Sequence, residues 1–123
     1  NASSDPYWQD HKKIENGRPF FKKYIPIIKT IAAAGWEPVT GASGNNASVR
    51  IERFGKSGNL FFTVRNNSSQ EVKCLITLDV TELKLAGKIT AKELVGGKPV
   101  KTENNKMYVT IPSQRTQVIQ IIP

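Results

Sequence analysis

The feature that most constrains this chain is a change in the spacing of its apolar residues at Gly35. Before Gly35, apolar side chains recur every three or four residues over 19–34, which is the period of one face of an α-helix. After Gly35, apolar and polar residues alternate in several short segments, as they do in β-strands with one buried face. The sequence therefore predicts a helix followed by a largely β domain.

The helical segment has recognisable ends. Pro19 suits a first turn, where its missing N–H costs nothing, and Gly35 suits a C-terminal cap. Pro26 lies inside the segment and removes a hydrogen bond, so we expect a kink or a break there. Trp36 follows the cap directly, and we expect it to wedge between the helix and the β domain. The apolar stripe consists of Phe20, Phe21, Tyr24, Ile27, Ile28 and Ile31.

The alternating segments predict strands at 49–54, 60–64, 72–78, 107–111 and 116–122, with a strand or irregular edge segment at 89–95. The first three are expected to be consecutive antiparallel strands, the first two joined across the loop at 55–58. The last strand is expected to be buried on both faces. Short strands separated by turn residues favour a sandwich over βαβ units. The predicted fold is mainly β, an antiparallel β-sandwich with an N-terminal helical segment.

The chain divides into three parts. Residues 1–17 form a polar lead-in, in which Asn1 and Ala2 resemble the remnant of a cleaved purification tag. Residues 18–35 form the amphipathic helix, which we interpret as the end of an upstream domain, and residues 36–123 form the sandwich. Because residue 1 is not a methionine and Met107 is the only one, we expect a piece of a larger protein.

Charge and composition disfavour several function classes. The net charge is +8, from 18 Lys and Arg against 10 Asp and Glu, but the basic residues are dispersed and mostly lysines. This favours a solvated basic surface over a nucleic-acid interface, for which clustered arginines are better suited. No apolar run is long enough to span a membrane. Cys74 is the only cysteine and is expected to be a small buried side chain, and we expect no cofactor or metal site.

Catalytic chemistry has little to build on in this sequence. The only histidine, His11, lies in the polar lead-in, so a nucleophile has no candidate base in the β domain. The carboxylates stand mostly at strand ends beside basic residues and are interpreted as ion-pair partners, with Glu37 the candidate for burial. The chain itself is therefore predicted not to be an enzyme. Trp36, Phe61 and Tyr108 are the aromatics expected at junction or outward positions.

Two stretches around the helix resemble a junction found in glycoside-hydrolase-like proteins. They read RPFFKKYIP over residues 18–26 and AGWEPVT over residues 34–40. In that family the last helix of a (β/α) barrel passes into a C-terminal all-β domain. Residues 49–55 and 60–66 are similar to the opening hairpin of that domain, and residues 92–97, 107–112 and 118–121 are similar to the closing strands of amylase-type accessory sandwiches.

The resemblance implies that this chain is a non-catalytic C-terminal accessory domain, and that its parent protein is a candidate glycosidase. The family's catalytic carboxylates lie in the barrel, so no residue of this chain inherits their role. The upstream domain is the expected partner, carbohydrate is a further one, and a secreted or periplasmic location is favoured. The residues expected to pack against the upstream domain are Phe20, Tyr24, Ile27, Ile28 and Trp36.

Two other functions stay open. A carbohydrate-binding module would use Trp36 and Tyr108 to stack against sugar rings, because flat aromatic side chains offer an apolar face to them. An immunoglobulin-like cell-surface interaction module would also be a sandwich, but it would not need the helix.

Overall fold

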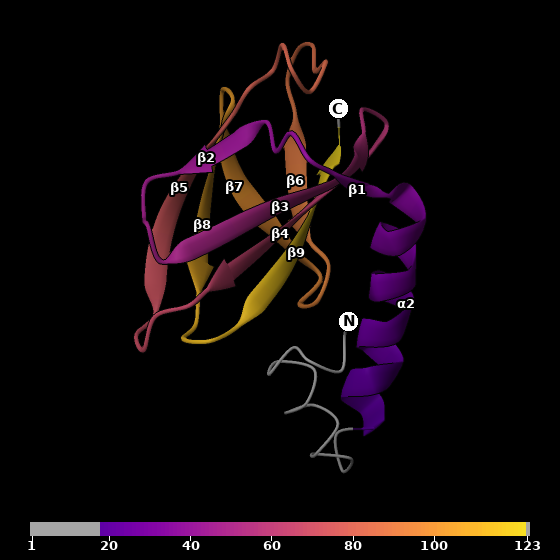
Figure 1. Ribbon diagram of the computed structural model, residues 1–123, viewed down its shortest axis with the longest axis vertical. Coiled ribbons are helices and arrows are strands. Elements are labelled where there is room, and N and C mark those ends of the chain that lie inside the picture. Colours follow the sequence, from indigo (N-terminus) through magenta and orange to yellow (C-terminus); the bar gives the residue numbers. More distant parts are fainter. Residues whose placement is uncertain (1–17, 123) are drawn as a thin grey trace.

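The computed structural model describes the backbone of residues 18–122 and the side chains of residues 24–122. Within that range one helix precedes nine strands (Figure 1). The elements are α2 (Arg18–Ala34), β1 (Trp36–Glu37), β2 (Ala42–Gly44), β3 (Val49–Lys56), β4 (Asn59–Asn66), β5 (Val72–Leu78), β6 (Thr90–Glu93), β7 (Lys98–Glu103), β8 (Lys106–Ile111) and β9 (Thr116–Ile122).

The strands form one antiparallel sheet that curls over on itself. Its strand order is β1-β3-β4-β9-β6-β7-β8-β5-β2. The sheet turns over at β7, whose first half pairs with β6 and whose second half pairs with β8. The result is two facing layers, which we call the β4 layer (β1, β3, β4, β9, β6) and the β5 layer (β8, β5, β2). This confirms the predicted mainly β, sandwich-like fold.

The main core lies between the two layers and is built from the inward positions of the alternating strands. Leu60, Phe62 and Val64 of β4 belong to the same buried cluster as Ile76 and Leu78 of β5. Burying a side chain of this size is worth about 1.5–3 kcal/mol, so this cluster is the main source of stability. Cys74 is also buried in it, as predicted.

A second, smaller core lies between α2 and the outer face of the β4 layer. Ile31 of the helix, Phe61 of β4 and Val118 of β9 are buried together, with Ile27 and Phe54 packed against them. The helix runs along the outside of the sandwich (Figure 1). Phe61 therefore points outward from its sheet, as expected, but it is covered by the helix and offers no surface to a ligand. Residues 18–122 contain no helix with the length and apolar character that crossing a membrane requires.

The helix itself follows the sequence closely. Gly35 ends it with φ of 92°, and its N–H donates to the carbonyl of Ile31 at 3.1 Å, so the predicted cap is confirmed. Of the kink or break expected at Pro26, the break does not occur, because α2 is continuous through this residue. Pro26 is exposed, so its ring does not disturb packing, and the Thr30 hydroxyl donates to its carbonyl at 2.9 Å.

The connections between strands differ from expectation in two places. The hairpin between β3 and β4 is tighter than predicted, because Lys56 pairs with Asn59 and only Ser57 and Gly58 form the turn. The third consecutive strand does not continue this hairpin. After β4 the chain crosses to the other layer, so β5 pairs with β8 and β2, and the free edge of β4 pairs with β9. Burial of the last strand on both faces is confirmed by Val118 and Ile119.

A buried asparagine fixes this crossover. Asn66, at the end of β4, is fully buried, and its amide nitrogen donates to the carbonyls of Gln70 at 2.7 Å and Ile111 at 2.9 Å. Its amide oxygen accepts from the backbone N–H of Ser68 at 2.9 Å. One side chain therefore joins the crossover from β4 to β5 to the end of β8, with its polar atoms satisfied.

Candidate functional site

The first candidate site is the outward face of the β5 layer around Tyr108. Tyr108 stands on β8 between the buried Met107 and Val109, so strand alternation turns its ring to solvent, and it is 39% exposed. Its hydroxyl donates to a carboxylate oxygen of Glu103 at 3.1 Å, and the ammonium of Lys101 lies 5.3 Å from the ring centre. A hydrogen bond at the tip and a cation over one face hold the ring in place.

An open hollow of about 260 Å³ lies beside this ring. It is lined by Tyr108 and Thr110 of β8, by Lys73 and Leu75 of β5, and by Asn45 after β2, among others. The hollow lies toward β5, whereas Lys101 stands on β7, the strand on the other side of β8. The arrangement offers one aromatic face, an ammonium group and small polar groups, which is suited to binding a polar ring-shaped ligand.

The contact with Glu103 has a measurable consequence. The hydrogen bond to Glu103 raises the pKa of Tyr108 above its ordinary value, and desolvation and the negative charge of Glu103 act in the same direction. The folded chain therefore keeps this phenol protonated at a pH where a free tyrosine has begun to ionise.

We expect Glu103→Ala to lower the pKa of Tyr108 toward the ordinary value, because it removes both the acceptor and the charge. The measurement is a pH titration of tyrosinate absorbance, with Tyr108→Phe identifying the contribution of Tyr108. Glu71→Ala is the control, because Glu71 is an exposed carboxylate just before β5. Identical titrations of the Glu103→Ala variant and the wild type would contradict the hydrogen bond.

The second candidate site is the junction between α2 and the sandwich. Trp36 is 57% exposed and does not wedge between the helix and the sheet, so that expectation is wrong. The reason is its register: Trp36 pairs with Phe54 in β3, and this edge position leaves most of the indole uncovered. Val39, three residues further on, is also exposed.

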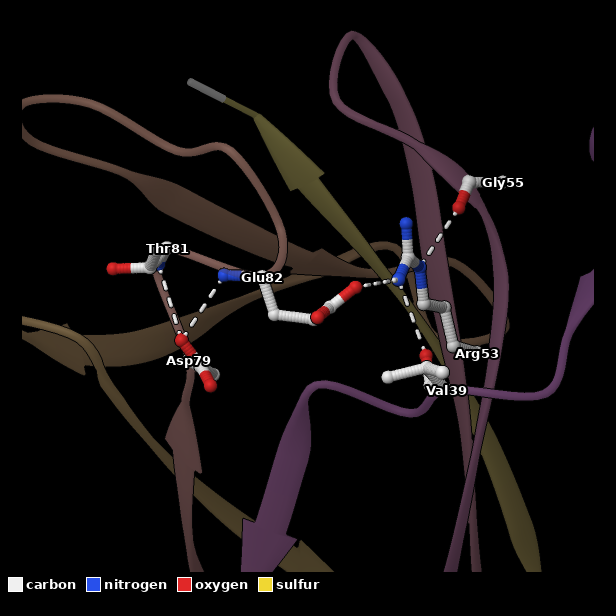
Figure 2. A network of polar contacts seen from close by, with 6 residues as sticks. All are labelled: Val39, Arg53, Gly55, Asp79, Thr81 and Glu82. Atoms are coloured by element: carbon white, nitrogen blue, oxygen red, sulfur yellow. Dashed lines mark hydrogen bonds and ion pairs between the residues drawn. The ribbon is translucent and has the colours of Figure 1, made fainter.

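Beneath this junction lies a buried arginine (Figure 2). Arg53 is only 6% exposed. Its side chain lies on the same inward-facing side of β3 as those of Val49 and Ile51, which pack against the main core. Its Nε donates to the carbonyl of Gly55 at 3.0 Å, and its Nη1 donates to the carbonyl of Val39 at 3.1 Å. The same nitrogen lies 3.9 Å from a carboxylate oxygen of Glu82.

The loop that carries Glu82 is organised by Asp79. A carboxylate oxygen of Asp79 accepts from the backbone N–H groups of Thr81 and Glu82, each at 3.1 Å (Figure 2). The N–H of Leu83 donates to the Asp79 carbonyl at 2.9 Å, and the Leu83 side chain is buried in the main core. The network therefore joins the segment after β1, strand β3 and this loop, and it closes one end of the sandwich.

Most acidic side chains of the described part of the chain have structural partners. Glu52 pairs with Arg50 and Glu82 with Arg53, as the ion-pair interpretation predicts. Asp79 and Glu93 instead accept backbone N–H groups, in the case of Glu93 those of residues 95, 96 and 118. Glu37 is half-buried on β1. Residues 18–122 bring together no group of three or more His, Cys, Asp or Glu that could hold a metal ion.

The aromatics expected to stack on sugars are not brought together. Trp36 lies in the β4 layer, on the same face as its partner Phe54, which packs under the helix. Tyr108 lies on the outer face of the β5 layer. Each would therefore have to act alone. His11 lies outside the described residues.

The residues expected to pack against an upstream domain have different surroundings. Tyr24 is 1% exposed, and its hydroxyl donates to the carbonyl of Thr116, so it is already buried within this chain and cannot face a neighbour. Ile27 and Ile28 are half-buried, while Trp36 is exposed. Phe20 is in α2, but its side chain lies outside the described residues.

No family model and no curated protein sequence matches this chain. Among solved structures, the fold is similar to part of a GH27 β-L-arabinopyranosidase from Geobacillus stearothermophilus, a structure determined in complex with arabinose. The TM-score is 0.50 and the two chains are 13% identical. The match covers 68% of this chain and 20% of that chain. At this identity the likeness describes the fold alone, and it concerns one sheet-rich region of a much longer enzyme.

Proposed function

We propose that this chain is a non-catalytic accessory domain of a glycoside-hydrolase-like protein, and that it packs against and stabilises an upstream catalytic domain. The observation that carries the proposal is the fold likeness to a region that makes up a fifth of a GH27 glycosidase. The acidic side chains Asp79, Glu82, Glu93 and Glu103 already serve structural contacts, which agrees with a domain that supplies no catalytic carboxylates.

The surface that would meet the upstream domain lies at the junction after α2. Trp36 and Val39 are both more than half exposed there, and a tryptophan that contributes so much surface is well suited to act as an anchor in an interface. Ile25, which is 45% exposed on α2, and the half-buried Ile27 and Ile28 extend the apolar character along the helix. Of the residues predicted to pack against the upstream domain, Tyr24 is removed, because it is buried in this chain's own core.

We expect Trp36→Ala to uncouple the two domains in the full-length parent protein. Removing a tryptophan that is buried in an interface costs about 2 kcal/mol or more of the free energy that couples the two domains. This loss lowers the Tm of the coupled unfolding transition by about 3 °C. Differential scanning calorimetry measures this shift. Tyr108→Ala is the matched control, because Tyr108 is an exposed aromatic on the other layer.

Two results would overturn the accessory role. One is an upstream sequence that lacks a barrel-sized alternation of strands and helices. The other is a Trp36→Ala protein whose domains unfold as cooperatively as those of the wild type.

A carbohydrate-binding module is the second candidate function, and the hollow beside Tyr108 favours it. An exposed ring with one face free and polar groups around it is a familiar way to hold a sugar. This role is compatible with the first, because Tyr108 and Trp36 lie on different layers of the sandwich.

A further inference from the structure

We propose that the outward face of β5, β8 and β7 binds an acidic polysaccharide, with the Tyr108 ring as the stacking platform and Lys73 and Lys101 as the groups that meet its negative charges. This inference rests on the carbohydrate-binding candidate function and specifies its ligand class.

The platform is pre-organised. Tyr108 is held from its tip by Glu103 at 3.1 Å and from one side by Lys101 at 5.3 Å, so little side-chain freedom remains to be lost on binding. The hollow offers access to the ring from the side of β5. A sugar ring seated there would contact Leu75 and the aromatic face with its apolar C–H groups, while Asn45 and Thr110 would contact its hydroxyls.

The charge of this face specifies the kind of sugar. Lys73, Lys101 and Lys106 are exposed outward residues of the three strands, and Glu103 is the acidic residue among them. The Glu103 carboxylate is already engaged by the Tyr108 hydroxyl. A neutral glycan would bring these ammonium groups no anionic partner, whereas a carboxylated or sulfated one would pair with them.

The spacing of the strands supports a chain-like ligand. Strand β8 lies between β5 and β7, so Tyr108 has one lysine-bearing strand on each side, each about 5 Å away. Lys73 is paired with Thr110 in β8, two residues along from Tyr108, while Lys101 is directly opposite Tyr108. The two ammonium groups are therefore offset along the sheet on opposite sides of the ring, which suits a polymer with repeated charges.

Nucleic acid is the less favoured polyanion. The hollow is lined by lysine and carries no arginine, and it is arginine that forms bidentate contacts to phosphate groups. A single aromatic ring also offers less than the successive stacking platforms of single-strand-binding proteins.

Affinity electrophoresis and titration calorimetry on the whole chain test the proposal, with polygalacturonate as the acidic probe, galactan as the neutral probe and sheared duplex DNA as the competing polyanion. We expect binding to polygalacturonate that weakens with added salt, and little binding to galactan. Tyr108→Ala should weaken the binding about tenfold or more, and Lys73→Gln about fivefold. Tyr108→Phe should retain most of it, because the ring remains.

The controls are Lys56→Gln, which removes an exposed lysine from β3 in the other layer, and Trp36→Ala, and both should bind like the wild type. Equal affinity for galactan would overturn the acidic ligand while leaving a carbohydrate-binding function. DNA binding as tight as that of polygalacturonate would overturn selectivity for a polysaccharide. Binding to none of the probes would overturn both the inference and the candidate function, and the calorimetric test of the accessory role would still stand.

Discussion

Gly55→Ala is expected to destabilise the chain by about 3 kcal/mol, a large share of the 5–15 kcal/mol that a domain of this size has. Gly55 has φ of 84°, which costs an L-residue about 1–2 kcal/mol. A Cβ at this position would also lie 2.0 Å from the carbonyl oxygen of Asn59, a backbone atom that cannot move without distorting the hairpin. Urea denaturation measures the loss.

The position of Gly55 explains why the effect should be large. Its N–H donates to the carbonyl of Gly35 at 2.7 Å and its carbonyl accepts from Arg53, so it joins the helix cap, the hairpin and the buried arginine. Gly58 in the same hairpin is the matched control. It has φ of 91° but open space around its missing Cβ, so Gly58→Ala should cost only about 1 kcal/mol. Equal losses for the two variants would contradict the steric argument.

Much of the fold could be predicted because its elements carry local signals. The Gly35 cap and the alternation over Val72–Leu78 are properties of a few neighbouring residues, and both were predicted to the residue. Strands β1 and β2 have two and three residues, too few to show alternation, and they exist because they pair with the edges of β3 and β5. Strand β7 (KPVKTE) has one large apolar side chain, Val100, so it carries no apolar pattern either.

The candidate sites were predictable only in part, for the same reason. Alternation between Met107 and Val109 places Tyr108 outward, which the sequence shows directly. Lys101 and Lys73 are its neighbours because β8 pairs with β7 and β5, and this pairing depends on which strands become adjacent in the sheet. Trp36 is exposed because of its register with Phe54, and no local signal specifies that pairing.

The Arg53 network had two local signals that sequence reasoning missed. Arg53 is two residues after Ile51 and four after Val49, both of which face inward, so alternation along β3 already points its side chain toward the core. The run DVTE over residues 79–82 has the spacing of a capping box, an acceptor followed three residues later by a glutamate. In the structure Asp79 caps as this pattern predicts, but Glu82 turns toward Arg53.

Arg53→Ala is expected to lower the free energy of unfolding by about 3 kcal/mol. The guanidinium donates to the buried carbonyl of Gly55 and the partly buried carbonyl of Val39, so its removal would leave both without this donor and would also open a cavity at the 6% exposed Arg53 site. Arg53→Lys should recover only part of this loss, because a single ammonium cannot reproduce two divergent N–H groups. Glu82→Gln should cost less than about 1 kcal/mol, since the carboxylate is 46% exposed and 3.9 Å from Nη1.

Arg50→Ala is the matched control in the same strand. Arg50 faces outward, is 70% exposed and pairs with Glu52 at 3.5 Å, so its loss should change the free energy of unfolding by about 0.5 kcal/mol or less. Urea denaturation of all four variants separates the two backbone contacts from the ion pair. If Glu82→Gln cost as much as Arg53→Ala, the ion pair and not the two carbonyls would hold this end of the sandwich. If Arg53→Ala were as mild as Arg50→Ala, the network would contribute nothing to stability.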